Sequence, residues 1–576
     1  MSDWDHKTDF LVVGSGGGGM TAALVAKQHG LNALVIEKTE KFGGSTGLSG
    51  GNIWIPNNPH MDGVGVRDSR EDALVYLKGI TKGRVPEERI VAYVDKAPEM
   101  VRYLEANSDV KFMAVPRYPD YYPEHPGGKI GARSIEPLPF RASRLGPEEF
   151  KLRRSGQGLV LGRMGLTAKE AHTLVQFSFW SFVLMFWIML KYWFDIGARR
   201  KGRGDGRLCL GVALVGRLRR ALMDADVPLW LSTTCEELIV EGGRVVGAKV
   251  TRDGKSMRIR AEKGVLFAAG GFAKNAKLRQ EHQQGPIGAD WTAACEGNTG
   301  EVIGMGQALG AAVDLMDDAW WTPVTLLPDG YPWLLVVEKS MPGCVMVNRA
   351  GKRFTNEAAP YVDVVKGQYA ANSDEAPSIP AYLIFDQRYR RSYPCGPLGP
   401  SRLQPDSSLP KRLRQGFLKK SGTLAGLAEK LGVDAAGLEA EIARFNGFAK
   451  AGKDEDFQRG DSLYDRYYSD SKIKPNPSLA PIVEAPFYAI EVWPGDLGTK
   501  GGLVTDVDGR VLKADGSAIE GLYATGNCSA AVMGNTYPGA GGTIGPSMTF
   551  GYAAALHAAG ATKSESARNS ERAAAE

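Results

Sequence analysis

The sequence DFLVVGSGGGGMTAALVAKQHGLNALVIE, residues Asp9 to Glu37, decides the fold of the chain. An apolar run, Phe10–Val13, leads into a glycine-rich turn, and an Ala/Leu-rich segment follows it. A second apolar run, Ala33–Ile36, ends at Glu37. The spacing G-x-G-x-x-G between a predicted strand and a predicted helix, with an acid about 20 residues further on, is typical of a dinucleotide-binding βαβ unit. A merely flexible loop would not require all four parts.

Each glycine of this motif has a physical reason. Gly14 permits the tight turn, Gly16 lets the backbone approach a pyrophosphate, and Gly19 allows the helix to pack closely on the strand. The start of the helix offers free N–H groups to the anion. Glu37 can accept hydrogen bonds from the ribose hydroxyls of an adenosine. We therefore expect Gly14 and residues 16–19 to hold a dinucleotide.

A second glycine-rich loop favours FAD over NAD as this dinucleotide. The sequence FGGST at 42–46, followed by Ser-Gly-Gly at 49–51, can close over a long cofactor with backbone and hydroxyl donors. Apolar runs that end on small residues return at 264–271 and 521–527, and glycines at 541–545 precede an Ala-rich helix whose start can face the flavin ring. The predicted FAD-binding residues are Gly14, Gly16, Gly17, Gly18, Gly19, Glu37, Lys38, Gly44, Ser45, Thr46, Gly50, Gly51, Ala269, Gly270, Gly526, Asn527, Thr543 and Ile544.

Composition excludes several other classes of protein. The chain has 576 residues, with 70 Lys and Arg against 65 Asp and Glu, so its net charge of +5 gives no global reason to expect nucleic-acid binding. Its 6 cysteines are scattered without C-x-x-C spacing, which argues against a disulfide framework and a metal site. We expect a reducing, cytoplasmic location and no signal peptide, because residues 1–9 are polar.

Changes in residue composition along the chain predict an inserted domain. From residue 320 the sequence becomes rich in aromatic residues and prolines, with a helical stretch at 423–450. Near residue 500 the pattern of the nucleotide-binding domain returns. We predict an α/β protein, α+β overall. A Rossmann-like FAD-binding domain (1–319 and 500–576) would carry an inserted α+β substrate-binding domain (320–499).

Several motifs together resemble the fumarate reductase-type FAD flavoproteins, and among these the 3-ketosteroid Δ1-dehydrogenases. The resemblance covers roughly residues 3–165 and 205–560. EKTEKFGGSTGLSGGNIW (37–54) is widely shared among flavoproteins, whereas three shorter motifs are far more specific. These are PDYYP (119–123), NEAAPY (356–361) and TYPGAG (536–541).

The resemblance implies FAD-dependent removal of two hydrogens from adjacent ring carbons of a 3-ketosteroid. It assigns catalytic roles to Tyr121, Tyr361, Tyr537 and Gly541. An α proton of a ketone is acidic only if the enolate oxygen is stabilised, and the Tyr537 hydroxyl with the Gly541 N–H would make a two-donor oxyanion hole. Tyr361 would take the proton, and Tyr121 would stabilise its phenolate. The hydride would go from the neighbouring carbon, C1, to N5 of the flavin.

Alternative functions remain open at this point. A related flavin enzyme could act at another steroid position or on another cyclic enone, as a Δ4-dehydrogenase or an ene-type reductase would, and a non-catalytic flavin-binding protein is a third class. The 7 histidines lie outside the predicted substrate domain, which disfavours a dicarboxylate substrate. With no second dinucleotide motif, the expected electron acceptor is a quinone or a carrier protein rather than NAD(P)H. The FAD is expected to be non-covalent.

Residues 174–194, LVQFSFWSFVLMFWIMLKYWF, form the most apolar stretch of the chain. They are long enough to span a bilayer, and a basic cluster from Arg199 to Arg207 follows. FAD-binding segments lie before and after this stretch, so a single crossing would divide one domain between two sides of the membrane. We expect residues 166–204 to dock the enzyme on the cytoplasmic membrane surface without crossing it. A buried oligomer contact is the alternative.

Overall fold

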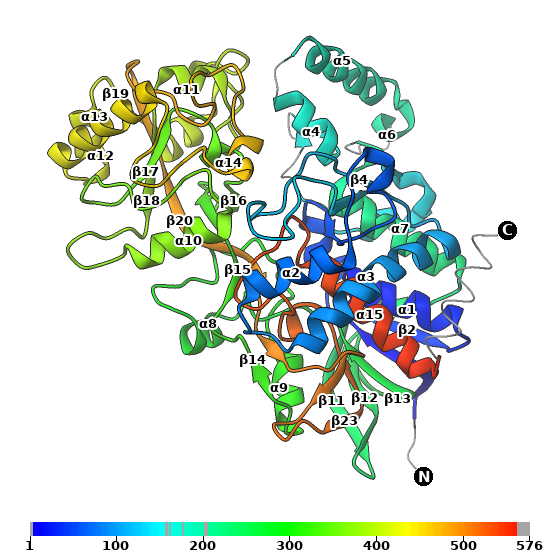
Figure 1. Cartoon of the computed structure of the whole chain (residues 1–576). Helices are drawn as coiled ribbons and strands as arrows, with labels where there is room; N and C mark the ends of the chain where they lie inside the picture. The colour runs from blue at the N-terminus through cyan, green and yellow to red at the C-terminus, as the bar shows by residue number, and fades with distance from the viewer. Residues whose placement is uncertain (1–3, 156–158, 161–162, 176–177, 201–204, 562–576) are drawn as a thin grey trace.

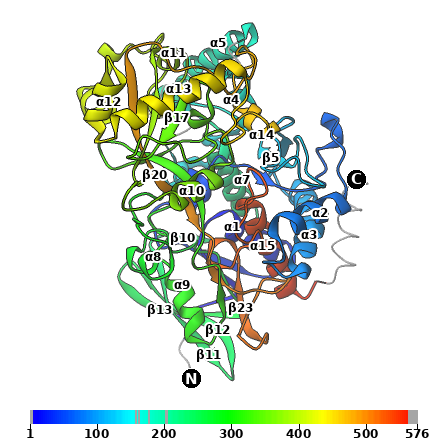
Figure 2. The same ribbon diagram turned by 60° about the vertical axis from the view of Figure 1, so that its left-hand side comes forward.

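The computed structural model of the chain describes residues 4–155, 159–160, 163–175, 178–200 and 205–561. It is a mixed α and β structure with two large sheets, as predicted (Figures 1 and 2). One sheet belongs to the dinucleotide-binding part in the lower half of Figure 1. The other belongs to the inserted segment in the upper left.

The first sheet is built around the N-terminal βαβ unit. Strands run in the order β10-β2-β1-β13-β12-β11, with β23 beside β13 and β22 beside β23. The central strands β10, β2, β1, β13 and β23 pair in parallel. The bounds are β1 His6–Val13, β2 Ala33–Ile36, β10 Leu229–Trp230, β11 Thr233–Glu241, β12 Arg244–Arg252, β13 Lys255–Phe267, β22 Arg510–Leu512 and β23 Ala518–Ala524.

Helices pack around this sheet and bury its apolar side chains. Helix α1 begins directly after the glycine turn and contacts α15 and α7. Gly14 has φ +111°, and a Cβ there would overlap the carbonyl of Ala268, so only glycine allows β1 and β13 to end this close together. The helices of this part are α1 Gly17–Gln28, α2 Arg70–Thr81, α3 Glu87–Asn107, α7 Leu210–Asp224, α8 Ala276–His282, α9 Glu301–Ala308 and α15 Ile544–Ala559.

The second sheet lies in the inserted segment and has the order β16-β15-β20-β18-β17, with β19 beside β20. The long antiparallel pair β15 and β20 carries the chain into and out of this segment. We keep 1–319, 320–499 and 500–576 as the proposed domain boundaries. The elements are β15 Ala319–Leu326, β16 Pro332–Leu334, β17 Cys344–Val347, β18 Ala381–Phe385, β19 Lys419–Ser421, β20 Phe487–Thr499, α10 Tyr361–Ala370, α11 Gln387–Ser392, α12 Leu424–Leu431, α13 Ala435–Ala451 and α14 Leu463–Tyr467.

The remaining strands are short and pair with one another in small sheets outside the two large ones. They are β3 Ile53–Trp54, β4 Phe112–Ala114, β5 Ser134–Pro137, β6 Phe140–Arg141, β7 Leu159–Val160, β8 Met164–Gly165, β9 Arg207–Leu208, β14 Val313–Asp314 and β21 Gly502–Leu503.

The apolar stretch at 174–194 is not one continuous helix. Helix α4 (Ala168–Val175) ends early in it, and α5 (Phe179–Phe194) begins after Ser178, whose side chain caps the new helix by accepting a hydrogen bond from the Ser181 N–H. The short α6 (Ile196–Arg200) follows. Among the described residues, we find no helix with both the length and the apolar character needed to cross a bilayer.

Candidate active site

One cavity of about 410 Å³ collects the predicted site residues. It is lined by the glycine turn, the 44–51 loop, the ends of β13 and β23 and the start of α15, and it continues towards three tyrosines. All of the predicted cofactor-binding and catalytic residues line it except Gly19. A Cβ at Gly19 would overlap the Gly14 carbonyl, so this glycine serves helix packing rather than contact with a ligand.

Glu37 lies at the end of β2 and is almost fully buried. Its Oε2 accepts hydrogen bonds from Ser15 Oγ (2.6 Å) and Ser15 N (3.2 Å), and its Oε1 accepts them from the N and Oγ1 of Thr39. All four acceptor positions of the carboxylate are therefore engaged. A ribose hydroxyl would have to share an oxygen with Ser15 or Thr39, so Glu37 also organises the two turns beside it.

The remaining lining residues fit FAD. Asn52 Oδ1 is buried, lines the cavity and has no hydrogen-bond partner within the described part of the chain. Such a buried acceptor calls for a donor from a ligand or from water. Lys38 is turned to one side, since its Nζ is bonded to Thr299 and lies 2.9 Å from Glu301 Oε1. We call the lining residues at 14–18, 37–52, 268–270, 526–527 and 543–547 the cradle.

Three tyrosines from distant segments meet in the inner part of the cavity. Tyr121 Oη donates a hydrogen bond to Tyr361 Oη at 2.6 Å. The ring of Tyr537 lies 5.1 Å from that of Tyr121 and 5.5 Å from that of Tyr361, and its hydroxyl lies 3.1 Å from Thr543 Oγ1. All three side chains are at least 94% buried. We call Tyr121, Tyr361 and Tyr537 the phenol cluster.

Backbone contacts hold two members of the phenol cluster together. The N–H of Tyr121 donates to the carbonyl of Pro538 at 3.0 Å, and Tyr76 Oη donates to the same carbonyl at 2.7 Å. Gly541 has φ +98°, and a Cβ there would lie 2.5 Å from the Asn52 carbonyl oxygen. The TYPGAG loop therefore cannot carry a side chain at this position without moving.

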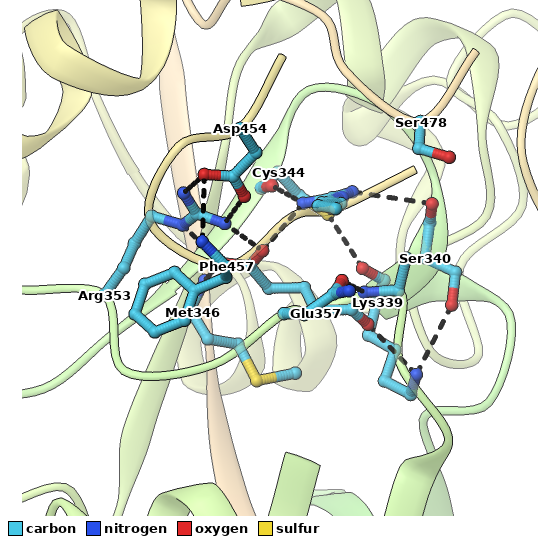
Figure 3. A network of polar contacts seen from close by, with 12 residues as sticks. Lys339, Ser340, Cys344, Met346, Arg353, Glu357, Asp454, Phe457 and Ser478 are labelled. Atoms are coloured by element: carbon cyan, nitrogen blue, oxygen red, sulfur yellow. Dashed lines mark hydrogen bonds and ion pairs between the residues drawn. The ribbon is translucent and has the colours of Figure 1, made fainter. Parts of the chain in front are cut away.

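A buried network of charges holds the third member, Tyr361, which is the first residue of α10. Glu357, in the loop before α10, accepts hydrogen bonds from Arg353 and Arg459, and Arg353 also binds Asp454 (Figure 3). Lys339 Nζ donates to the carbonyls of Glu357 (3.0 Å) and Ala359 (2.7 Å). The NEAAPY loop is thus bonded along its length before Tyr361 begins the helix.

Burial governs the electrostatics of the cluster. It raises the pKa of Tyr121 and that of Tyr361 well above the ordinary value of a phenol, and for Tyr361 the hydrogen bond from Tyr121 acts in the opposite direction. The pKa of Tyr537 is also raised by burial and lowered by its bonds to Thr543 and Tyr361. The free protein therefore holds neutral phenols at pH 7.

The sequence analysis missed several residues that line the cavity. Tyr118, Tyr467 and Tyr468 line it, and Tyr468 Oη donates to Tyr118 Oη at 2.8 Å. His172 of α4 also lines it and stacks on Tyr467, with ring centroids 4.4 Å apart. The prediction placed every histidine outside the substrate domain. The sequence position is right, but helix α4 brings His172 to the cavity wall.

The fold and the cradle define a FAD-binding flavoprotein, and residues 9–544 match the family described as FAD binding domain. The 3-oxosteroid 1-dehydrogenase of Mycobacterium tuberculosis is 46% identical over 96% of this chain and 98% of its own length. A 4-oxocyclohexanecarboxylate 2-dehydrogenase of Sinomonas cyclohexanicum is 36% identical over 96% of this chain and 93% of its own. The chain belongs to the FAD-dependent 3-oxosteroid 1-dehydrogenase family.

A solved structure agrees with this family. The crystal structure of 3-ketosteroid Δ1-dehydrogenase from Sterolibacterium denitrificans, in complex with 1,4-androstadiene-3,17-dione, superposes with a TM-score of 0.94. It is 44% identical and covers 96% of this chain and 100% of its own. The predicted fold, family and FAD cofactor are confirmed.

Proposed function

We propose that this enzyme dehydrogenates 3-ketosteroids between C1 and C2 with the phenol cluster as its acid–base machinery. The observation that carries the assignment of roles is the meeting of Tyr121, Tyr361 and Tyr537 in one buried cavity beside the cradle. FAD, when bound, supplies the oxidant that takes up the hydride from C1.

Tyr537 and Gly541 act on the ketone. Tyr537 and Gly541 both line the cavity, and in this proposal the Tyr537 hydroxyl and the Gly541 N–H donate to the C3 oxygen as enolate charge forms on it. Because Tyr537 is buried and a positive φ restrains Gly541, these donors need little reorganisation during the reaction. Tyr361 takes the proton from C2, and the C1–C2 double bond forms as the hydride leaves C1.

Tyr361 must lose its own proton before it can act as a base. Burial opposes this, and the 2.6 Å hydrogen bond from Tyr121 favours it, because a donor stabilises the phenolate. Two tyrosines are therefore needed where one would be a poor base. Activity should consequently rise with pH.

A small cyclic keto acid is the second candidate substrate, favoured by the 36% identity to the 4-oxocyclohexanecarboxylate enzyme. A carboxylate needs a cation, yet Lys38 is the only lysine or arginine among the described lining residues, and it is paired with Glu301. The cavity lining also includes the apolar side chains of Leu334, Val336 and Val337. This lining favours the steroid.

Turnover assays decide between these substrates. The purified holoenzyme should oxidise androst-4-ene-3,17-dione and cholest-4-en-3-one with a dye as electron acceptor, and should not oxidise 4-oxocyclohexanecarboxylate. Activity on the keto acid alone would overturn the proposal. Replacing the dye with a soluble ubiquinone analogue or with NAD+ tests the acceptor, and only the quinone is expected to support turnover.

We further propose that α5 docks the enzyme on the cytoplasmic membrane surface. Its aromatic side chains point into solvent, with Trp180 69%, Trp187 56% and Trp193 66% exposed. In Figure 1, α5 lies at the upper edge of the molecule. The few buried side chains of α5 pack on α4 and β8 within the same segment (164–194). An apolar face of this kind suits the head-group boundary of a bilayer.

Part of the predicted basic cluster has another role. Arg207 forms an ion pair with Glu170 at 2.7 Å and does not face lipid freely. Arg200 is exposed, whereas Lys201 and Arg203 lie outside the described residues. Helix α4 connects the two regions, since Ala168, Ala171 and His172 line the cavity and α5 packs on α4. The proposed docking helix therefore packs on a helix that forms part of the cavity wall.

Vesicle binding tests this docking surface. The holoenzyme should cosediment with vesicles of phosphatidylcholine and phosphatidylglycerol, and the variant Trp187→Gln/Trp193→Gln should lose at least half of that binding. The matched control is Leu403→Gln, because Leu403 is 84% exposed but lies far along the chain in the other domain. Equal binding by all three proteins, or dimer dissociation by the tryptophan variant alone, would overturn docking.

A further inference from the structure

Lys500 is a fully buried lysine beside the oxyanion loop, and no role above uses it. It follows β20 directly, and its side chain has 0% exposure. Its Nζ donates to the carbonyl of Thr536 at 2.9 Å and to Asp318 Oδ2 at 3.1 Å. Thr536 is the residue before Tyr537, so this bond holds the backbone from which the oxyanion donor projects.

The same ammonium group contacts the aromatic neighbour of Tyr537. Nζ lies 4.8 Å from the centre of the Trp320 ring, and that ring lies 4.8 Å from the ring of Tyr537 in an edge-on arrangement. Trp320 Nε1 in turn donates to Asn527 Oδ1 at 3.1 Å, in the cradle. Lys500 thus contacts Tyr537 indirectly in two ways, through the backbone of Thr536 and through the Trp320 ring. The Trp320 ring is also hydrogen-bonded to the cradle.

Lys500 also joins the two strands that enter and leave the inserted segment. Asp318 precedes β15, Lys500 follows β20, and the Lys500 N–H donates to the Asp318 carbonyl at 3.1 Å. A buried ammonium is costly unless it is paired and hydrogen-bonded, and burial lowers the pKa of Lys500 to about 8. The two bonds at Nζ offset this cost only in this geometry, so the charge tolerates little displacement of its partners.

We propose that Lys500 is a positioning residue that fixes the hydroxyl of Tyr537 in the cavity. This rests on the assignment of Tyr537 as an oxyanion donor. Loss of the Nζ–carbonyl bond would free the TYPGAG loop and the Trp320 ring, and displacement of a catalytic group by about 1 Å can cost up to 100-fold in rate.

A double-mutant cycle on the holoenzyme tests this. Lys500→Met keeps the length of the side chain and removes its donors, and kcat on androst-4-ene-3,17-dione should fall about 10- to 100-fold with unchanged FAD content. In a Tyr537→Phe background the same change should cost less than about twofold, because the group it positions is already absent. A purely structural loss would be equal in both backgrounds and would overturn the inference.

Two further proteins complete the design. Lys96→Met is the matched control, since Lys96 also binds one backbone carbonyl (Val507) and one carboxylate (Asp508) but lies on α3, and it should keep wild-type kcat. If Lys500→Met fails to fold, Lys500→Met/Asp318→Asn removes both charges and gives the same comparison. A Tyr537→Phe enzyme with normal kcat would overturn the oxyanion assignment itself, which is a separate result from equal Lys500 losses.

Discussion

The cradle and the phenol cluster share one cavity but are held in different ways. The cradle presents the glycine turn between β1 and α1, the 44–51 loop and the start of α15, so most of its geometry comes from backbone near strand ends. The phenol cluster takes one side chain from each of three segments that are distant in sequence. Hydrogen bonds to the Pro538 carbonyl and from Lys339 and Lys500 hold these segments. Changes in the cradle should therefore alter cofactor affinity, and changes around the cluster should alter the chemical step.

Tyr361→Phe should have the largest effect. Removing the hydroxyl removes the base, and its hydrogen-bond partner among the described residues is the Tyr121 phenol rather than a histidine or carboxylate that could replace it. We expect no measurable turnover, with FAD content and steroid affinity nearly unchanged. Stopped-flow reduction of the bound flavin by substrate measures the chemical step directly. Retention of even a tenth of wild-type turnover would show that the base is another group.

Tyr537→Phe should follow. Loss of one oxyanion donor typically lowers kcat by about 100- to 1,000-fold, and the Gly541 N–H remains to support the residual rate. The ring stays, so the packing on Trp320 and Tyr361 is preserved. Steady-state kinetics with matched FAD occupancy check this. A rise in KM alone would indicate a role in binding only.

The pH dependence should be smaller but distinctive. Because burial holds the pKa of Tyr361 above its ordinary value, the phenolate fraction and kcat should rise about tenfold per pH unit on the acid side of that pKa. The neutral buried phenol contributes stability fully below a pH of about 10, the pKa of an unfolded tyrosine, and this contribution is lost as the pH rises through the folded pKa. Rates measured from pH 6 to 7.5, below the pKa of about 8 of Lys500, therefore report the Tyr361 phenol. A flat profile would contradict a tyrosine base.

Glu37→Gln should have the smallest effect on the reaction and a clear one on the cradle. The amide loses the charge that accepts from Ser15 and Thr39, and a charge-assisted hydrogen bond contributes about 1.5–3 kcal/mol, so FAD affinity should fall at least about tenfold. At saturating FAD, kcat should be close to wild type. The apoenzyme is prepared by acid precipitation, which is expected to release the non-covalent cofactor. Titrating it with FAD measures the affinity. A large fall in kcat would contradict the view that the cradle governs cofactor affinity and the phenol cluster governs the chemical step.

The sequence by itself determined the cradle because its parts are local. A glycine turn, an acid at the end of the next strand and small residues at strand ends each have short-range causes, and nearly all of the predicted residues line the cavity. It also indicated the three tyrosines, through motifs shared with a family rather than through their own chemistry. It identified the apolar stretch but not the break before Ser178, which begins a separate helix.

Only the tertiary structure decided what surrounds those tyrosines. Tyr118 and Tyr468 lie 350 residues apart and share a hydrogen bond, and His172 reaches the cavity on a segment predicted to serve only the membrane. Lys500 lies in the sequence DLGTKGG (496–502), in which nothing indicates that its ammonium group is buried against Asp318 and Thr536. Contacts between segments this distant depend on how the two sheets pack. That packing depends on the burial of apolar surface over the whole chain, so a short sequence pattern cannot predict it.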